Sequence, residues 1–167
     1  MLSRLLRPSS QKIAAILLFA LFAAALTAAF VKFPQGAPLP PFLNLAGKFH
    51  PLILHLPIGM LVGAVLLECF TGPLRRHDAA VTLLLWLGFV SSMKAVLAGY
   101  FLAQPGGYPQ DVLQWHLWSG ISVPVLTFIT LLAKLHHQQK SPLMSSSLYR
   151  VPLFTTAAAL FVAGHFG

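Results

Sequence analysis

Five long apolar segments constrain the fold of this chain more than any other feature of its sequence. They cover residues 13–31, 51–70, 79–103, 115–135 and 151–166. Each has, or approaches, the roughly 17 to 25 residues that a helix needs to cross the core of a bilayer. Only 8% of the 167 residues are charged, against about 25% in a typical soluble domain. We therefore predict an all-α integral membrane protein with five transmembrane helices, of which the second to fifth form an up-and-down four-helix bundle.

The segments between these helices divide the chain into three parts. Residues 1–33 are expected to form an N-terminal membrane anchor, and the proline-rich residues 34–48 an exposed periplasmic linker. Residues 49–167 would then form the four-helix domain. The first apolar segment follows a basic start and also resembles a signal peptide. We expect it to remain as an anchor, with a cleaved signal as the alternative.

The basic residues predict the orientation of the helices, because Lys and Arg are enriched in cytoplasmic loops. With five spans, one side of the membrane holds Arg4, Arg7, Lys12, Arg75, Arg76, Lys134, Lys140 and Arg150. The other side holds Lys32 and Lys48. The N-terminus should therefore be cytoplasmic and the C-terminus periplasmic. We therefore attribute the net charge of +8 to the basic residues that set the membrane topology. We expect no nucleic-acid partner.

Four of the seven histidines fall at the outer ends of predicted spans: His50, His55, His116 and His165. At about 1.5 Å of rise per residue, His55 and His165 both lie roughly 22 Å above the inner ends of their helices. His116 lies about 27 Å and His50 about 30 Å above theirs. Two imidazoles at one height can bind a single haem iron from opposite sides.

These heights predict that residues 49–167 bind one or two haem b groups. The first choice of axial ligands is His55 with His165. The second pair, His50 with His116, would bind a second haem. If the protein holds one haem, His50 and His116 would be supporting residues beside it. His50 and His55 are five residues apart, so they point about 140° apart around a helix. They should therefore not bind one iron from the same side.

Four further residues are candidates for contact with such a cofactor. Lys94 lies at the predicted height of His55 and would pair with a haem propionate, unless it snorkels to the outer surface. Gly59 and Gly63 could leave a slot for the flat macrocycle or allow close packing of two helices. Trp115 belongs to an outer aromatic belt and could pack against the cofactor edge.

The sequence offers little for an enzyme active site. It has three acidic residues, which leaves general acid–base chemistry without candidates, and we expect Glu68 to pair with Arg75 or Arg76. The single cysteine, Cys69, excludes an intramolecular disulfide and a CxxC pair. Enzyme activity stays uncertain, and a non-catalytic electron-transfer subunit is favoured.

The run HPLILHLPIGMLVGAVLLE, with RRHDAAVTLLLWLG, WHLWSGI and AGHFG further along, resembles a family of largely uncharacterised bacterial inner-membrane proteins. The hallmark of that family is HPxxxHFP before an apolar helix, and here Leu56 replaces the usual Phe. Related membrane regions occur in planctomycete-type cytochrome c proteins. The resemblance covers residues 49–167 and implies a small haem-carrying or electron-transfer module. Its motif residues correspond to His50, His55, His116 and His165.

The function expected from the sequence is one-electron transfer near the outer face of a bacterial inner membrane. The partners would be membrane lipid and a periplasmic cytochrome or other subunits of a larger complex, with a membrane quinone as a further candidate. Two alternatives stay open. The four outer histidines could handle copper or zinc, which both accept imidazole, or the chain could be a non-redox anchor for a larger complex.

Overall fold

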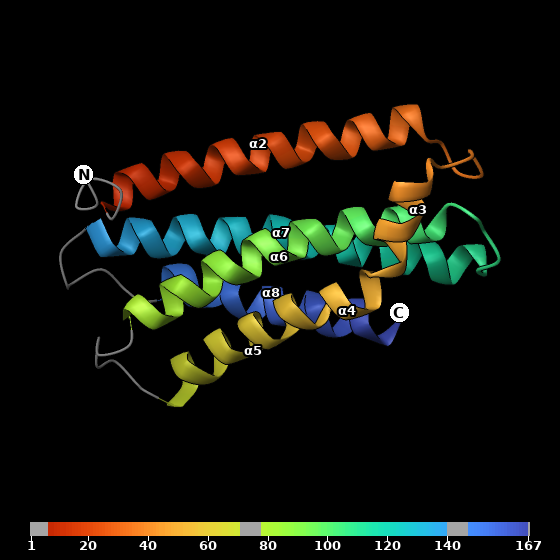
Figure 1. Ribbon diagram of the computed structural model, residues 1–167. Helices are drawn as coiled ribbons and strands as arrows, with labels where there is room; N and C mark the ends of the chain where they lie inside the picture. Colours follow the sequence, from red (N-terminus) through yellow and green to blue (C-terminus); the bar gives the residue numbers. More distant parts are fainter. Residues whose placement is uncertain (1–6, 71–77, 140–146, 167) are drawn as a thin grey trace.

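The computed structural model describes residues 7–70, 78–139 and 147–166, and every regular element in these ranges is a helix. In chain order the elements are α2 (Pro8–Lys32), α3 (Pro41–Lys48), α4 (His50–Ile53), α5 (His55–Phe70), α6 (Asp78–Ala103), α7 (Gln110–Gln139) and α8 (Ser147–His165). The all-α prediction is therefore confirmed. Figure 1 shows the long helices lying side by side, with the short α3 crossing one end.

Among the described residues, four helical stretches are long and apolar enough to cross a membrane. They are Pro8–Lys32, His50–Phe70, Asp78–Ala103 and Gln110–Gln139. The predicted count of five spans is therefore wrong by this measure. The fifth segment does form a helix, the 19-residue α8. However, α8 begins at Ser147, so it includes the charged Arg150 that the predicted segment of residues 151–166 left out.

Helices α5, α6, α7 and α8 form a closed four-helix arrangement. Consecutive helices pack against each other, and α5 also contacts α8. Small residues allow the close contacts that helices need in lipid. A Cβ atom on Gly88 of α6 would lie 2.7 Å from Cδ2 of Leu61 on α5. The core holds fully buried side chains from all four helices, among them Leu61, Leu85, Phe89, Leu131 and Leu153.

A polar network joins the same four helices at the end opposite α3. The fully buried Lys134 donates to Asp78 Oδ1 at 2.7 Å, and its Nζ lies 4.1 Å from the centre of the Tyr149 ring. The Tyr149 hydroxyl donates to Glu68 Oε1 at 2.6 Å, and Arg150 Nε donates to the same oxygen at 2.8 Å. Glu68 thus pairs across the bundle with α8. Its expected arginine partners between α5 and α6 lie outside the described residues.

Helix α2 packs along the outside of α7 (Figure 1). The Phe19 ring stacks on Phe128, with centroids 4.4 Å apart and planes 3° apart. At the C-terminal end of α2, the Phe33 carbonyl accepts a hydrogen bond of 2.6 Å from the Tyr100 hydroxyl of α6. The buried residues of α2 recur every seven positions, so that they share one face: Ala15, Phe22 and Ala29.

Candidate functional site: a histidine-lined cavity

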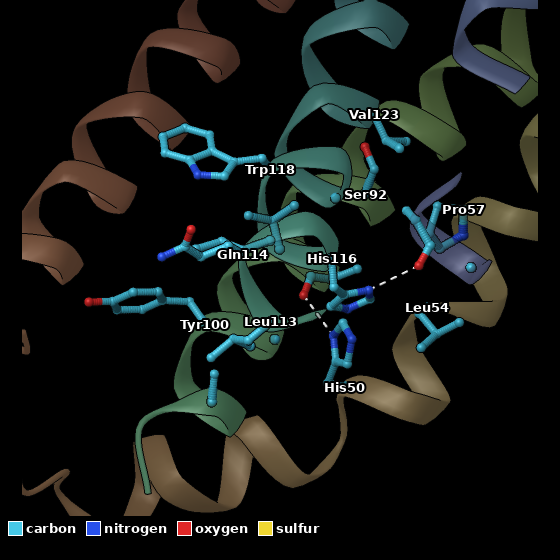
Figure 2. Close-up of a pocket in the computed structure, with 18 of the residues that line it drawn as sticks. His50, Leu54, Pro57, Ser92, Tyr100, Leu113, Gln114, His116, Trp118 and Val123 are labelled. Carbon is cyan, nitrogen blue, oxygen red and sulfur yellow. Dashed lines mark hydrogen bonds between the residues drawn. The ribbon is translucent and has the colours of Figure 1, made fainter. Parts of the chain in front are cut away.

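A cavity of about 760 Å³ opens at the end of the bundle where α3 and α4 lie. Its walls come from α2, the α4–α5 segment, α6, α7 and α8. His50 and His116 are both on its surface, and Figure 2 shows their rings next to each other. The ring centroids are 6.1 Å apart and the ring planes are nearly perpendicular, at 84°.

Each of these two imidazoles is oriented by a backbone carbonyl. His50 Nδ1 lies 2.9 Å from the Ala95 oxygen, and His116 Nδ1 lies 2.9 Å from the Ala163 oxygen. A carbonyl oxygen can only accept, so Nδ1 is the donor in both contacts. In the neutral rings this leaves Nε2 without a proton and able to bind a metal. Metal-binding histidines are commonly held in this way by a hydrogen bond from the other nitrogen.

Two close backbone approaches position His50. A Cβ atom on Gly99 would lie 2.8 Å from His50 Cε1 and 3.0 Å from its Nδ1. The ring can therefore rest on α6 because residue 99 has no side chain. In α3, a Cβ atom on Gly47 would lie only 2.7 Å from the Leu102 backbone nitrogen. This contact holds α3 against α6, and α4 begins with His50 two residues after α3 ends.

His116 reaches the cavity from the inward-facing side of α7. Residues spaced by three and four positions share one face of a helix. The buried members of this face are spaced in that way and end at the polar network: Val123, Thr127, Thr130 and Lys134. Gly120 lies three residues before Val123, and His116 lies four residues before Gly120. Both residues line the cavity. The sequence therefore directs His116 into the bundle.

The first predicted pair, His55 and His165, does not line the cavity. Both side chains are exposed. His55 Nδ1 lies 2.6 Å from the Pro51 carbonyl one turn earlier in the chain. The His165 ring contacts the neighbouring Phe166, with centroids 5.1 Å apart. Of the four outer histidines, the structure thus brings together the two that formed the second predicted pair.

The other predicted contact residues also lie outside the cavity wall. Lys94 and Trp115 have exposed side chains. Gly59 faces open space, since a Cβ atom there would meet nothing within 4 Å. A Cβ atom on Gly63 would lie 3.5 Å from Leu84 Cδ1, so Gly63 faces the contact between α5 and α6.

Several residues of the cavity were not identified from the sequence. The two accepting carbonyls have no pattern of their own that marks them. Four glutamines also line the cavity: Gln35, Gln104, Gln110 and Gln114. The spacing of four between Gln110, Gln114 and Trp118 was an available signal, because it places these side chains on one face of a helix.

The described part of the chain is a helical bundle with four stretches long and apolar enough to cross a membrane, and two carbonyl-oriented histidines lie near one end of that bundle. The chain belongs to the family described as "Predicted membrane protein (DUF2231)", whose model matches residues 47–167. The membrane-protein part of the predicted resemblance is thereby confirmed, and the relation to cytochrome c proteins stays a prediction. No curated protein and no solved structure matches the chain. Helix α2 precedes the matched region.

Proposed function

We propose that this protein is a membrane-embedded b-type cytochrome subunit with His50 and His116 as the axial ligands of one haem. The arrangement of these two imidazoles is the observation that carries the proposal. A metal held by two opposed imidazole nitrogens at about 2.0 Å each keeps the ring centroids roughly 6 Å apart. The ring centroids of His50 and His116 are 6.1 Å apart. We therefore prefer this pair to His55 and His165.

The number of available ligands favours haem over copper or zinc. Structural zinc sites use four protein ligands and catalytic sites usually three. In the described parts of the chain, no group of three or more His, Cys, Asp or Glu side chains could hold a metal. A haem iron needs only axial ligands from the protein, because the porphyrin fills the other positions. Two histidines are therefore sufficient for haem.

The cavity also has features that suit a flat cofactor. Its volume, about 760 Å³, lies within the range of about 300 to 1,000 Å³ typical of ligand sites. Gly120 and Gly164 line it and face open space. None of the lining residues is a lysine or arginine, so we do not assign a propionate to Lys94 in this proposal. The amide groups of Gln110 and Gln114 are the donors available for that role.

Haem would supply one-electron redox chemistry, and the protein would hold it and limit its contact with water. The excess of basic residues on the opposite side of the predicted topology supports a position of the cavity near the periplasmic face of a bacterial inner membrane. The N-terminus would then be cytoplasmic. Electrons would pass to or from a periplasmic cytochrome, a quinone or another subunit of a larger complex, without catalysis by this chain alone.

The absorption spectrum of the purified full chain tests this proposal, together with elemental analysis for iron, copper and zinc. We expect reduced b-type bands and about one haem per polypeptide, as one ligand pair implies. Stoichiometric copper or zinc without these bands would support the metal-handling alternative. A protein with neither haem nor metal would overturn the proposal and favour a non-redox anchor.

A further inference from the structure

Helix α3 is only eight residues long, yet its side chains divide into three distinct faces. All of its residues are exposed except Leu43 and Gly47. These two are four positions apart, so they share one face of the helix. This face meets α6, because a Cβ atom on Gly47 would lie 2.7 Å from the backbone nitrogen of Leu102. The other two faces are exposed and differ in chemistry.

The first exposed face of α3 is apolar. Phe42 is 69% exposed, and Leu45, three residues further on, is 57% exposed. Phe49 follows directly after the helix and is 48% exposed. It continues the same face, because seven residues separate it from Phe42. A contiguous group of large exposed apolar side chains indicates contact with a membrane or with a partner.

The second exposed face of α3 is polar. It carries Asn44 and Lys48, which are four residues apart and both exposed. Phe42 and Asn44 are two residues apart, so they point about 200° apart around the helix. The helix contains no acidic residue. A helix with Phe and Leu on one face and a basic, polar opposite face is typical of those that lie in the membrane–water interface.

The position of α3 along the bundle fits such a location. Helix α6 has 26 residues and therefore rises about 39 Å, whereas the hydrocarbon core of a bilayer is about 30 Å thick. The ends of α6 thus extend into the headgroup regions, and α3 contacts α6 at Leu102 in its last turn. Figure 1 shows α3 crossing the end of the bundle, so it can lie in the plane of the membrane surface.

We propose that α3 is an interfacial helix that binds the bilayer surface on the side of the cavity. Phe42, Leu45 and Phe49 insert among the acyl chains, and Lys48 reaches the lipid phosphate groups. Insertion also helps to hold His50, because α4 begins with this residue two positions after α3 ends. This placement of α3 goes beyond the function proposed above and does not depend on haem.

Electron paramagnetic resonance of the spin-labelled full chain in phosphatidylcholine nanodiscs tests this placement. Phe42→Cys and Asn44→Cys, each in the Cys69→Ser background, provide a matched pair of labelling sites on the two exposed faces. Power saturation compares access of oxygen, which concentrates in lipid, with access of a water-soluble nickel complex. We expect oxygen to reach the label at residue 42 better, and the nickel complex to reach the label at residue 44 better.

Two results would overturn the placement. Equal access of the nickel complex to both labels would mean that α3 lies in water. Poor access of both reagents to both labels would mean that a second copy of the chain covers α3.

Two charged substitutions test whether insertion of α3 holds α4. Leu45→Glu adds a charge to the apolar face, where an ionised group among acyl chains is unfavourable, and Asn44→Glu adds the same charge to the polar face. Hydrogen exchange is measured over α4, where the Leu54 amide donates to the His50 carbonyl at 2.9 Å. We expect severalfold faster exchange in Leu45→Glu and little change in Asn44→Glu. Equal rates in the two variants would contradict a role of insertion.

The outcome is separable from that of the haem proposal. His50→Ala should lose haem and leave the access of both reagents to both labels unchanged. If no preparation contains haem but the labels at residues 42 and 44 differ as expected, only the haem proposal fails. If the protein retains haem and the nickel complex reaches both labels equally, only the placement of α3 fails.

Discussion

The His50 imidazole rests directly on the backbone of α6 at Gly99. A methyl group at residue 99 would lie 2.8 Å from His50 Cε1, closer than such atoms approach in folded proteins. The same ring is bonded through Nδ1 to the Ala95 carbonyl, one turn earlier in α6. A missing side chain and a backbone acceptor on one helix therefore fix the position of a histidine from another.

Gly99→Ala should displace this ring and lower haem occupancy. Overpacking of a tight contact costs about 1–3 kcal/mol, and we expect a loss of stability in that range. Haem per polypeptide and thermal unfolding in detergent measure the two effects. Gly59→Ala is the matched control, because a Cβ atom there meets nothing within 4 Å. Normal haem occupancy in Gly99→Ala would show that this contact does not position His50.

Asp78→Asn should destabilise the protein strongly. The Lys134 side chain is fully buried, and Asp78 carries the carboxylate to which it donates at 2.7 Å. Removal of one partner of a buried ion pair costs about 3–5 kcal/mol because the other charge is left uncompensated, and we expect the lower part of that range because the Asp78 side chain is 32% exposed. Chemical denaturation in detergent measures the change. The double substitution Asp78→Leu with Lys134→Met should recover most of the loss, and Asp111→Asn, at an exposed position, should have little effect.

Phe19→Ala should weaken the attachment of α2 to the bundle. The Phe19 and Phe128 rings are stacked with centroids 4.4 Å apart, and such pairs contribute about 0.5–1.5 kcal/mol beyond burial of area. A double-mutant cycle with Phe128→Ala measures this coupling directly. Phe42→Ala removes an exposed ring on α3 and serves as the control. A coupling energy near zero would mean that other contacts hold α2.

Cys69 can report the orientation of the protein in the membrane. It is exposed near the end of α5 that lies beside the polar network, and it is the single cysteine of the chain. If the N-terminus is cytoplasmic, a membrane-impermeant maleimide should label it in inside-out vesicles and leave it unlabelled in right-side-out ones. Cys69→Ser provides the background signal. The reverse labelling pattern would contradict the proposed topology.

The sequence predicted the helices well because length and continuous apolarity decide which segments can span a bilayer. The fifth predicted segment, residues 151–166, began after Arg150, whereas α8 begins at Ser147 and includes this charged residue. Glu68 shows a related difficulty. A near neighbour in the sequence was the simplest partner for its charge, whereas Arg150 and Tyr149 approach it only after the helices pack.

The histidine pair illustrates what height along a helix cannot predict. His55 and His165 have matched estimated heights, yet both are exposed. Direction around the helix depends on packing, and for His50 it also depends on the break between α4 and α5. The face of α7 was the available guide, because His116 continues the inward-facing spacing of Val123 and Thr127.

Haem retention in single histidine variants tests the central claim most directly. Haem per polypeptide would be measured for His50→Ala, His116→Ala, His55→Ala and His165→Ala, each purified as the full chain and checked for folding by circular dichroism. The account predicts that the first two lose haem and that the last two keep it at the level of the unchanged protein. Full occupancy in His50→Ala or His116→Ala, or loss confined to His55→Ala and His165→Ala, would contradict it.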